Sequence, residues 1–213
     1  MEIAADKKYY HIQKKGSWEV GETYFIGKEK NTFYTYFDKK GNNYYDPKSG
    51  RSINTFDIAK SMVDFLKTKR KSPNLTKFHS FDKDQAIKHL FDTLGHYLRF
   101  VREHLFEEVR KEFFPDLPSR LRCLWIIPHD KNAVNYWWKN LGRKGKIFEI
   151  SVSGKVHQAS QQYLNITTQS FDYIREQAFK YWAAKSVENQ NEYECLFEGF
   201  VKVEKEKQIT DFK

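Results

Sequence analysis

One long amphipathic helix, predicted from Asp82 to Phe113, constrains this chain more than any other feature. Apolar residues recur along it at intervals of three and four, the spacing that places them on one side of a helix. They are Ile87, Leu90, Phe91, Leu94, Leu98, Val101, Leu105, Val109 and Phe113. The opposite side is charged: Arg102, Glu103, Glu107, Glu108 and Arg110. Pro115 cannot continue the helix, so the helix is predicted to end just before it.

Shorter segments on both sides of this helix alternate as strands do. Strands are predicted at residues 9–12, 20–27, 32–37, 120–127, 146–152 and 193–203. Further helices are predicted at residues 55–68, 132–141 and 171–184, and a polar loop or hairpin at 38–52. A turn is expected at Ser153-Gly154. The last strand is expected to break at Gly199, and the segment from Glu204 to Lys207 after it is expected to fray. The order predicts an α+β fold: a single domain over residues 1–213, with a helical insert at about 55–115.

The composition supports a folded, basic protein. Aromatic residues make up 17 % of the chain, enough large rings to fill a core. The net charge of +9 favours contact with nucleic acid, although a lysine-rich surface that maintains solubility gives the same number. Cys123 and Cys195 stand alone in apolar runs, which argues against a zinc knuckle or a disulfide framework. With no signal peptide and no apolar run of about 20 residues, the expected compartment is the cytoplasm, without membrane contact.

Standard catalytic motifs are absent from the sequence. It contains no glycine-rich phosphate loop, no His-Glu-x-x-His and no Gly-x-Ser-x-Gly. His89, His96 and His104 follow one another along the long helix at spacings of seven and eight, so a metal site is conceivable. No matched set of carboxylates accompanies them, and we expect no metal.

Two glutamates near the end of the chain form the most informative pair. Glu192 and Glu194 lie two apart in a predicted strand, so their side chains project from the same face. Repulsion between paired carboxylates can raise the pKa of one of them, which suits that group to transferring protons. A single carboxylate can also stabilise the oxocarbenium ion that develops when an N-glycosidic bond breaks. On spacing alone, an ordinary exposed strand with Glu at alternate positions is the favoured interpretation.

From Tyr9 to Val203 the order of segments resembles the ADP-ribosyltransferase superfamily. Tyr9-Tyr10-His11-Ile12 is similar to the first core strand, where many members hold a His on the NAD ribose. Residues 20–27, followed by Asn31, resemble a segment of the rifampicin-modifying members. The second core strand of those members, and the tryptophan-bearing helix after it, resemble residues 123–126 and the helix with Trp137. The next strand and its glycine turn resemble residues 146–154. The resemblance implies a split β-sheet core around a long central helix.

The last strand carries the implied catalytic residue. Residues 194–201 resemble the Glu-Val-Leu-Val strand of DNA-modifying members, whose first Glu is catalytic, and Asn191-Glu192-Tyr193 resembles the Asn-Glu-Tyr of poly-ADP-ribosylating enzymes. The resemblance therefore implies Glu194 as the catalytic residue, with Glu192 as its partner.

The resemblance also implies an NAD site. Pro118-Ser119-Arg120 before a strand resembles a prokaryotic branch in which Ser119 and Arg120 would lie at the cleft, with Arg120 forking onto the pyrophosphate. A buried ion pair from this turn to Glu107 or Glu108 is the structural alternative. NAD contacts are expected from Tyr10, His11, Tyr24, Asn31, Ser119, Arg120 and Trp125. Tyr24, Tyr36 and Trp125 compete to stack on nicotinamide.

The implied function is transfer of ADP-ribose from NAD to nucleic acid, with RNA favoured over DNA. The resemblance extends to RNA-modifying toxins of bacterial toxin–antitoxin–chaperone phage-defence systems, which implies a neutralising antitoxin partner. NAD would be a substrate rather than a resident cofactor. The alternatives are the same transfer to protein, plain NAD hydrolysis, a non-catalytic nucleic-acid-binding domain, and a structural phage or prophage protein.

Overall fold

The computed structural model describes residues 2–32, 34–35, 43–46, 51–69, 83–165, 169–185 and 193–212. The chain divides into two compact units, one made of Met1–Thr35 and Arg102–Lys213, the other of Tyr36–Val101. The second unit occupies the middle of the chain, where the sequence predicts a helical insert at about 55–115. In the part of the chain that the structure describes, no helix is both long enough and apolar enough to span a bilayer.

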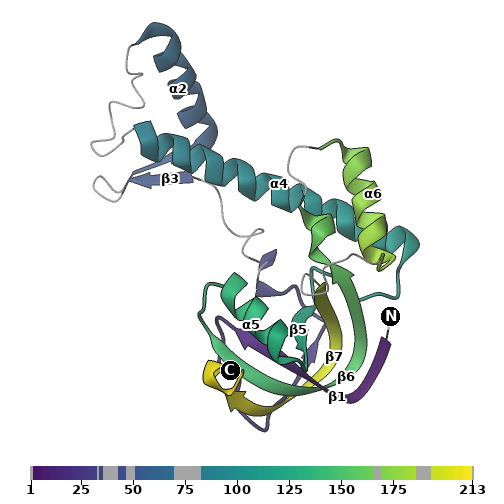
Figure 1. Cartoon of the computed structure of the whole chain (residues 1–213). Coiled ribbons are helices and arrows are strands. Elements are labelled where there is room, and N and C mark those ends of the chain that lie inside the picture. Colours follow the sequence, from purple (N-terminus) through teal and green to yellow (C-terminus); the bar gives the residue numbers. More distant parts are fainter. Residues whose placement is uncertain are drawn as a thin grey trace. The chain divides into compact units, whose positions relative to one another are not determined.

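The first unit is built on a five-stranded antiparallel sheet (Figure 1). Its strands are β1 (Glu2–Gln13), β2 (Thr23–Ile26), β5 (Leu124–Pro128), β6 (Lys146–Ser160) and β7 (Tyr193–Lys207). The order is β2-β7-β5-β1-β6, and an additional β6–β7 pairing joins the two long strands directly. Four strands, β1, β6, β7 and β5, therefore form a closed ring, and β2 pairs with β7. The α+β class expected from the sequence is confirmed.

Closing the ring gives the sheet an inner and an outer face, and side chains alternate between them. The inner core contains Tyr9, Phe148, Ile150, Phe197 and Val201 together with smaller apolar residues of all four strands. The apolar residues at intervening positions of the same strands belong to two other clusters on the outer face. Because adjacent residues face opposite ways, a strand buried on both faces is apolar nearly throughout.

Helices cover two parts of the outer face. Helix α5 (Lys131–Asn140) is capped by Asp130, whose side chain accepts the Ala133 N–H, and it packs against β5 next to the C-terminal 3-10 turn (Ile209–Phe212). Helix α6 (Phe171–Trp182) is capped by Ser170. Its residues Ala178, Tyr181 and Trp182 form a cluster with Phe106 and Val109 of α4 (Lys83–Phe113). A further 3-10 turn, η1 (Gln161–Leu164), contributes Leu164 to this cluster.

The second unit contains a two-stranded hairpin, β3 (Asn43–Asp46) with β4 (Arg51–Asn54), and helix α2 (Thr55–Thr68). Asn54 caps α2 through the Phe56 N–H. Ile58 and Met62 of α2 pack with Ile53 and with Leu90 of α4. The predicted helix at residues 55–68 is confirmed in full, and α4 matches the predicted long helix, while Asp82 itself lies outside the described residues.

Several predicted elements are wrong in position or type. The described residues Thr32, Tyr34 and Thr35 are helical, whereas the sequence predicts a strand there. Strand β5 begins only at Leu124, because residues 120–122 form a turn. The C-terminal residues 204–207, expected to fray, are part of β7, and residues 205–207 pair with β6.

Two glycines predicted to interrupt strands instead allow them to come together. Strand β6 continues through Gly154 and β7 through Gly199, and the two glycines are direct partners across the ladder. A Cβ atom on Gly154 would lie 2.3 Å from the carbonyl oxygen of Glu198. Glycine is needed here because the two backbones approach too closely for any side chain, and not because the chain turns.

Candidate functional site

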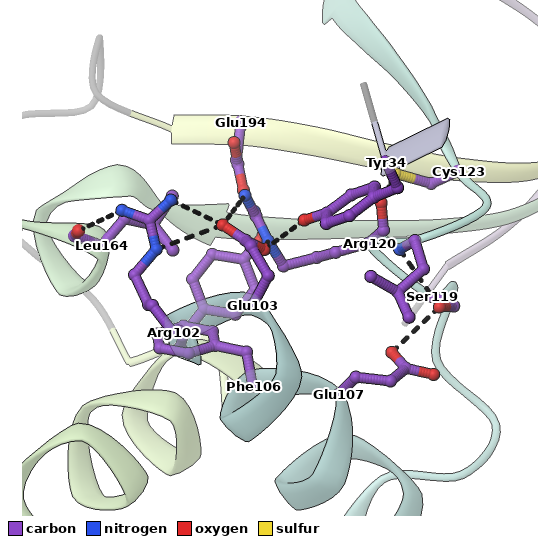
Figure 2. Close-up of polar contacts among 12 residues, drawn as sticks. Tyr34, Arg102, Glu103, Phe106, Glu107, Ser119, Arg120, Cys123, Leu164 and Glu194 are labelled. Atoms are coloured by element: carbon purple, nitrogen blue, oxygen red, sulfur yellow. Dashed lines mark hydrogen bonds and ion pairs between the residues drawn. The ribbon is translucent and has the colours of Figure 1, made fainter. Parts of the chain in front are cut away.

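Arg120 lies at the centre of a buried ionic cluster in the first unit (Figure 2). Its Nε donates to Glu103 over 2.7 Å, and its Nη1 donates to the hydroxyl of Tyr181 over 2.7 Å and to the carboxylate of Glu194. The Tyr181 hydroxyl also donates to Glu194. Glu194, the predicted catalytic residue, is thus only 5 % exposed and is held by two donors.

A second arginine and a second tyrosine complete the cluster around Glu103, which is fully buried. Arg102 donates to Glu103 over 2.6 Å and to the carbonyl of Leu164 over 2.7 Å, and the Tyr34 hydroxyl donates to Glu103 (Figure 2). Desolvation opposes ionisation of Glu103, but the charges of Arg120 and Arg102 outweigh it and lower its pKa to about 2. Two carboxylates and two guanidinium groups therefore neutralise one another inside the protein.

The same surface of α4 continues into a second ion pair, one helical turn further on. Arg110 donates through Nε and Nη2 to the two oxygens of Glu107, over 3.0 and 2.8 Å. The Ser119 hydroxyl donates to Glu107 over 2.9 Å. The turn does form a buried ion pair, but Arg120 makes it with Glu103 and Glu194 and not with Glu107 or Glu108 as considered from the sequence. Glu108 pairs with Arg175 instead.

The turn that carries Arg120 is fixed by Asn31. The Asn31 side-chain amide donates to the carbonyls of Arg120, over 2.9 Å, and Cys123, over 3.2 Å, and its backbone N–H donates to the carbonyl of Leu121. The amide oxygen accepts the N–H of Tyr34, so Asn31 also positions the tyrosine that reaches Glu103. Asn31, predicted as an NAD contact, holds the backbone of the cluster together.

Trp125 lies beside the cluster, whereas His11 points the other way. The guanidinium carbon of Arg120 is 6.0 Å from the centre of the Trp125 ring. The Nδ1–H of His11 donates to the Trp125 carbonyl over 2.9 Å, but the His11 ring lies 4.9 Å from that of Trp18, which packs on the inner core. Burial lowers the pKa of His11 to about 4, although this hydrogen bond opposes the shift. A neutral imidazole is expected at physiological pH.

The predicted catalytic residue and the predicted NAD contacts are therefore divided among three places. Glu194, Arg120, Ser119, Asn31 and Trp125 gather at the cluster. His11 and Tyr24 belong to the inner side, where the Tyr24 ring stacks on Trp18 at 5.1 Å. Tyr10 lies on the outer face in the apolar cluster that includes residues of α5, with its hydroxyl 2.8 Å from His129 Nε2. Glu192 and Tyr36 lie outside the described residues.

Three residues with no role predicted from the sequence also have polar contacts in the cluster: Tyr34, Glu103 and Tyr181. For Glu103 there was a signal: Glu103, Glu107 and Arg110 recur at intervals of four and three, so they share one side of α4. A charged stripe of this kind can face buried partners as well as water. Tyr34 and Tyr181 gave no comparable signal, because their contacts are made only in the folded chain.

The arrangement can hold a carboxylate rigidly beside aromatic rings, but its charges already balance. Preorganised negative charge of this kind can stabilise a developing cation. Among the described residues, no three His, Cys, Asp or Glu side chains gather as a metal site. Of the three histidines considered for one, His89 bonds Thr55 over 2.7 Å, His96 is buried and His104 is exposed.

Comparison with curated proteins gave no match. A family model does match, over residues 9–211, which include the whole ionic cluster and nearly all of the sheet. Its description is "protein of unknown function (DUF2441)". The chain belongs to this DUF2441 family.

Proposed function

We propose that the protein is an NAD-dependent ADP-ribosyltransferase that modifies nucleic acid, RNA in preference to DNA, in the cytoplasm. The observation that carries the proposal is the buried, hydrogen-bonded position of Glu194. This residue is a strand glutamate, nine-tenths buried, held by Arg120 and Tyr181 and on the same outer face as Trp125. A fixed carboxylate with aromatic rings nearby suits the cationic ribose that forms when nicotinamide leaves.

The reaction breaks the bond between the ribose C1′ and the nicotinamide nitrogen, and nicotinamide leaves with the electron pair. A nucleophile of the target then bonds C1′ and loses a proton. Glu194 would lower the energy of the oxocarbenium-like state between these events. In this proposal Arg120 is a positioning residue rather than a pyrophosphate ligand, because Glu103, Tyr181 and Glu194 already occupy its donors.

The net charge of +9 supports a polyanionic target. Unchecked consumption of NAD and modification of RNA would harm the cell that makes such an enzyme. We therefore include a neutralising protein partner in the proposal, as in the phage-defence toxins that the sequence resembles.

Release of nicotinamide from labelled NAD tests the proposal directly. Purified wild-type protein is incubated with RNA, with DNA and with lysate protein, and the label is followed into each fraction. We expect release, and transfer to RNA. Glu194→Gln should abolish release, whereas Glu206→Gln, at a partly exposed ion pair with Lys146, should not. Circular dichroism would verify that both variants fold. No release by folded wild-type protein with any of the three targets would refute the proposal.

A second candidate function, a non-catalytic nucleic-acid-binding domain, is favoured by the charge balance of the cluster. Glu103 and Glu194 are matched by Arg102 and Arg120, as in an ionic core that stabilises a fold. In that case folded Glu194→Gln protein would keep its RNA affinity, and the wild type would release no nicotinamide.

A further inference from the structure

An open pocket of about 270 Å³ lies where β2, β6 and β7 meet, away from the ionic cluster's buried centre. Phe25, Gly27, Lys155, Glu198 and Gly199 contribute to its lining. The close approach of β6 and β7 at Gly154 and Gly199 leaves backbone rather than side chains at this point. A planar group could therefore reach the backbone here.

Two side chains of opposite charge line the pocket without neutralising each other. Lys155 of β6 and Glu198 of β7 are direct partners across the ladder, but among the described residues no ion pair joins them. The Oε1 atom of Glu198 accepts the Ser119 N–H over 2.8 Å. No other described residue donates to the carboxylate, so one oxygen fixes the group and the other is available to a ligand.

Exposed aromatic rings lie beside these charges. Phe25 and Phe200 are partners across β2 and β7, their ring centres are 5.0 Å apart, and each is 56 % exposed. Phe25 also lines the pocket. Two exposed phenylalanines on neighbouring strands cost solubility, and proteins that bind unpaired bases use such rings as stacking platforms.

We infer that this pocket binds a guanine base. Guanine presents N–H donors beside a carbonyl oxygen on one edge, which complements the free Glu198 oxygen and the Lys155 ammonium, while its flat face can stack on Phe25. The other bases do not offer two donors next to one carbonyl. The inference rests on the nucleic-acid part of the proposed function, but not on NAD cleavage. A free guanine nucleotide presents the same chemistry.

Fluorescence anisotropy with short, uridine-rich single-stranded RNAs tests the inference. The central base is guanine, hypoxanthine, adenine, cytosine or uracil. We expect the guanine strand to bind at least about fivefold more tightly than the adenine, cytosine and uracil strands, with hypoxanthine intermediate because it lacks the 2-amino group. Guanosine monophosphate is then added to compete with the labelled guanine strand. If it displaces the strand at a concentration similar to that of the strand itself, the pocket takes a free nucleotide. If displacement is weak, the pocket takes guanine within an RNA strand.

Variants locate the binding. Phe25→Ala should weaken all strands about tenfold through lost stacking, whereas Phe171→Ala, which removes an exposed ring on α6, should not. Glu198→Gln keeps an oxygen for the Ser119 N–H but presents an amide donor to guanine, so the guanine preference should disappear. Lys155→Met should reduce the preference as well. The matched control is Glu206→Gln, and thermal unfolding monitors the fold of each variant.

Equal affinity for all five strands, or a guanine preference that survives in folded Glu198→Gln and Lys155→Met, would overturn the inference. Nicotinamide release is measured on the same preparations. If nicotinamide is released but no guanine preference is found, only the inference that the pocket binds guanine is overturned. If a guanine preference is found but no nicotinamide is released, only the proposed transferase activity is overturned.

Discussion

His11 and Glu194 lie on opposite faces of the same sheet. His11 is the direct partner of Phe148, which belongs to the inner core, whereas Glu194 is the partner of Ala159, which belongs to the outer cluster with Leu196. Directly opposed residues of a ladder project from the same face, so the two side chains are separated by the sheet itself. A ligand held by Glu194 cannot be held by His11 from the same side.

Replacing His11 should therefore change KM for NAD less than the sequence resemblance implies. His11→Asn keeps a side-chain nitrogen for the Trp125 carbonyl, and we expect KM for NAD to stay within about twofold of the wild type. If His11 instead binds the NAD ribose, loss of that hydrogen bond should raise KM about tenfold. Steady-state nicotinamide release at varied NAD distinguishes the two outcomes.

Removing Arg120 should destabilise the first unit strongly. Arg120→Met leaves Glu103 and Glu194 buried without their shared partner, which typically costs about 3–5 kcal/mol in the free energy of unfolding. Urea unfolding followed by circular dichroism measures the change. Arg175→Met, which removes an arginine paired with Glu108 and Glu112 at the surface, should leave the midpoint nearly unchanged. An Arg120→Met protein as stable as wild type would contradict the ionic role described for the cluster.

Alanine should have opposite effects at two glycines. At Gly154 its Cβ would lie 2.3 Å from the Glu198 carbonyl oxygen, so Gly154→Ala must push β6 and β7 apart and should cost at least about 2 kcal/mol. At Gly95, within α4, no described atom beyond the adjoining backbone of the helix lies within 4 Å of the added Cβ. Gly95→Ala should therefore stabilise by about 0.5–1 kcal/mol. The two unfolding curves, compared with wild type, test both signs; a tolerated Gly154→Ala would contradict the close contact.

Stability should decrease in mild acid because of a buried histidine. His157 is 3 % exposed, its Nε2 has no partner among the described residues, and burial lowers its pKa from 6.5 to about 4. The unfolded chain therefore binds more protons between about pH 6.5 and 4, and the free energy of unfolding falls as the pH falls through that window. The full effect is up to about 3 kcal/mol.

His157→Phe should flatten this dependence while keeping a ring against Trp182, which lies 5.5 Å away. His11 contributes in the same direction, so some slope remains in the variant. The lowered pKa of Glu103 acts at lower pH, where stability is lost as the pH falls from about 4.5 towards 2. An unchanged slope between pH 6.5 and 4 in folded His157→Phe would show that His157 does not titrate as described.

The helices and most strands could be predicted from local patterns. The spacing of apolar residues predicted α2 and α4, and the apolar runs predicted β1, β6 and β7, because those signals depend on neighbours within a few residues. The turn predicted at Gly154 and the strand break predicted at Gly199 are both wrong, because β6 and β7 continue through these glycines. A glycine that opens a turn and one that lets two strands touch look alike until the partner strand is known.

By itself, the sequence determined the α+β class, the long helix and the strand that carries Glu194. Only the tertiary structure decided which way each polar side chain faces. Arg120 reaches Glu103 and Glu194 across 17 and 74 positions of the chain, and the closing of the sheet places His11 and Glu194 on different faces. Contacts at such separations leave no local periodicity, because they arise only when the β6–β7 pairing closes the ring of strands.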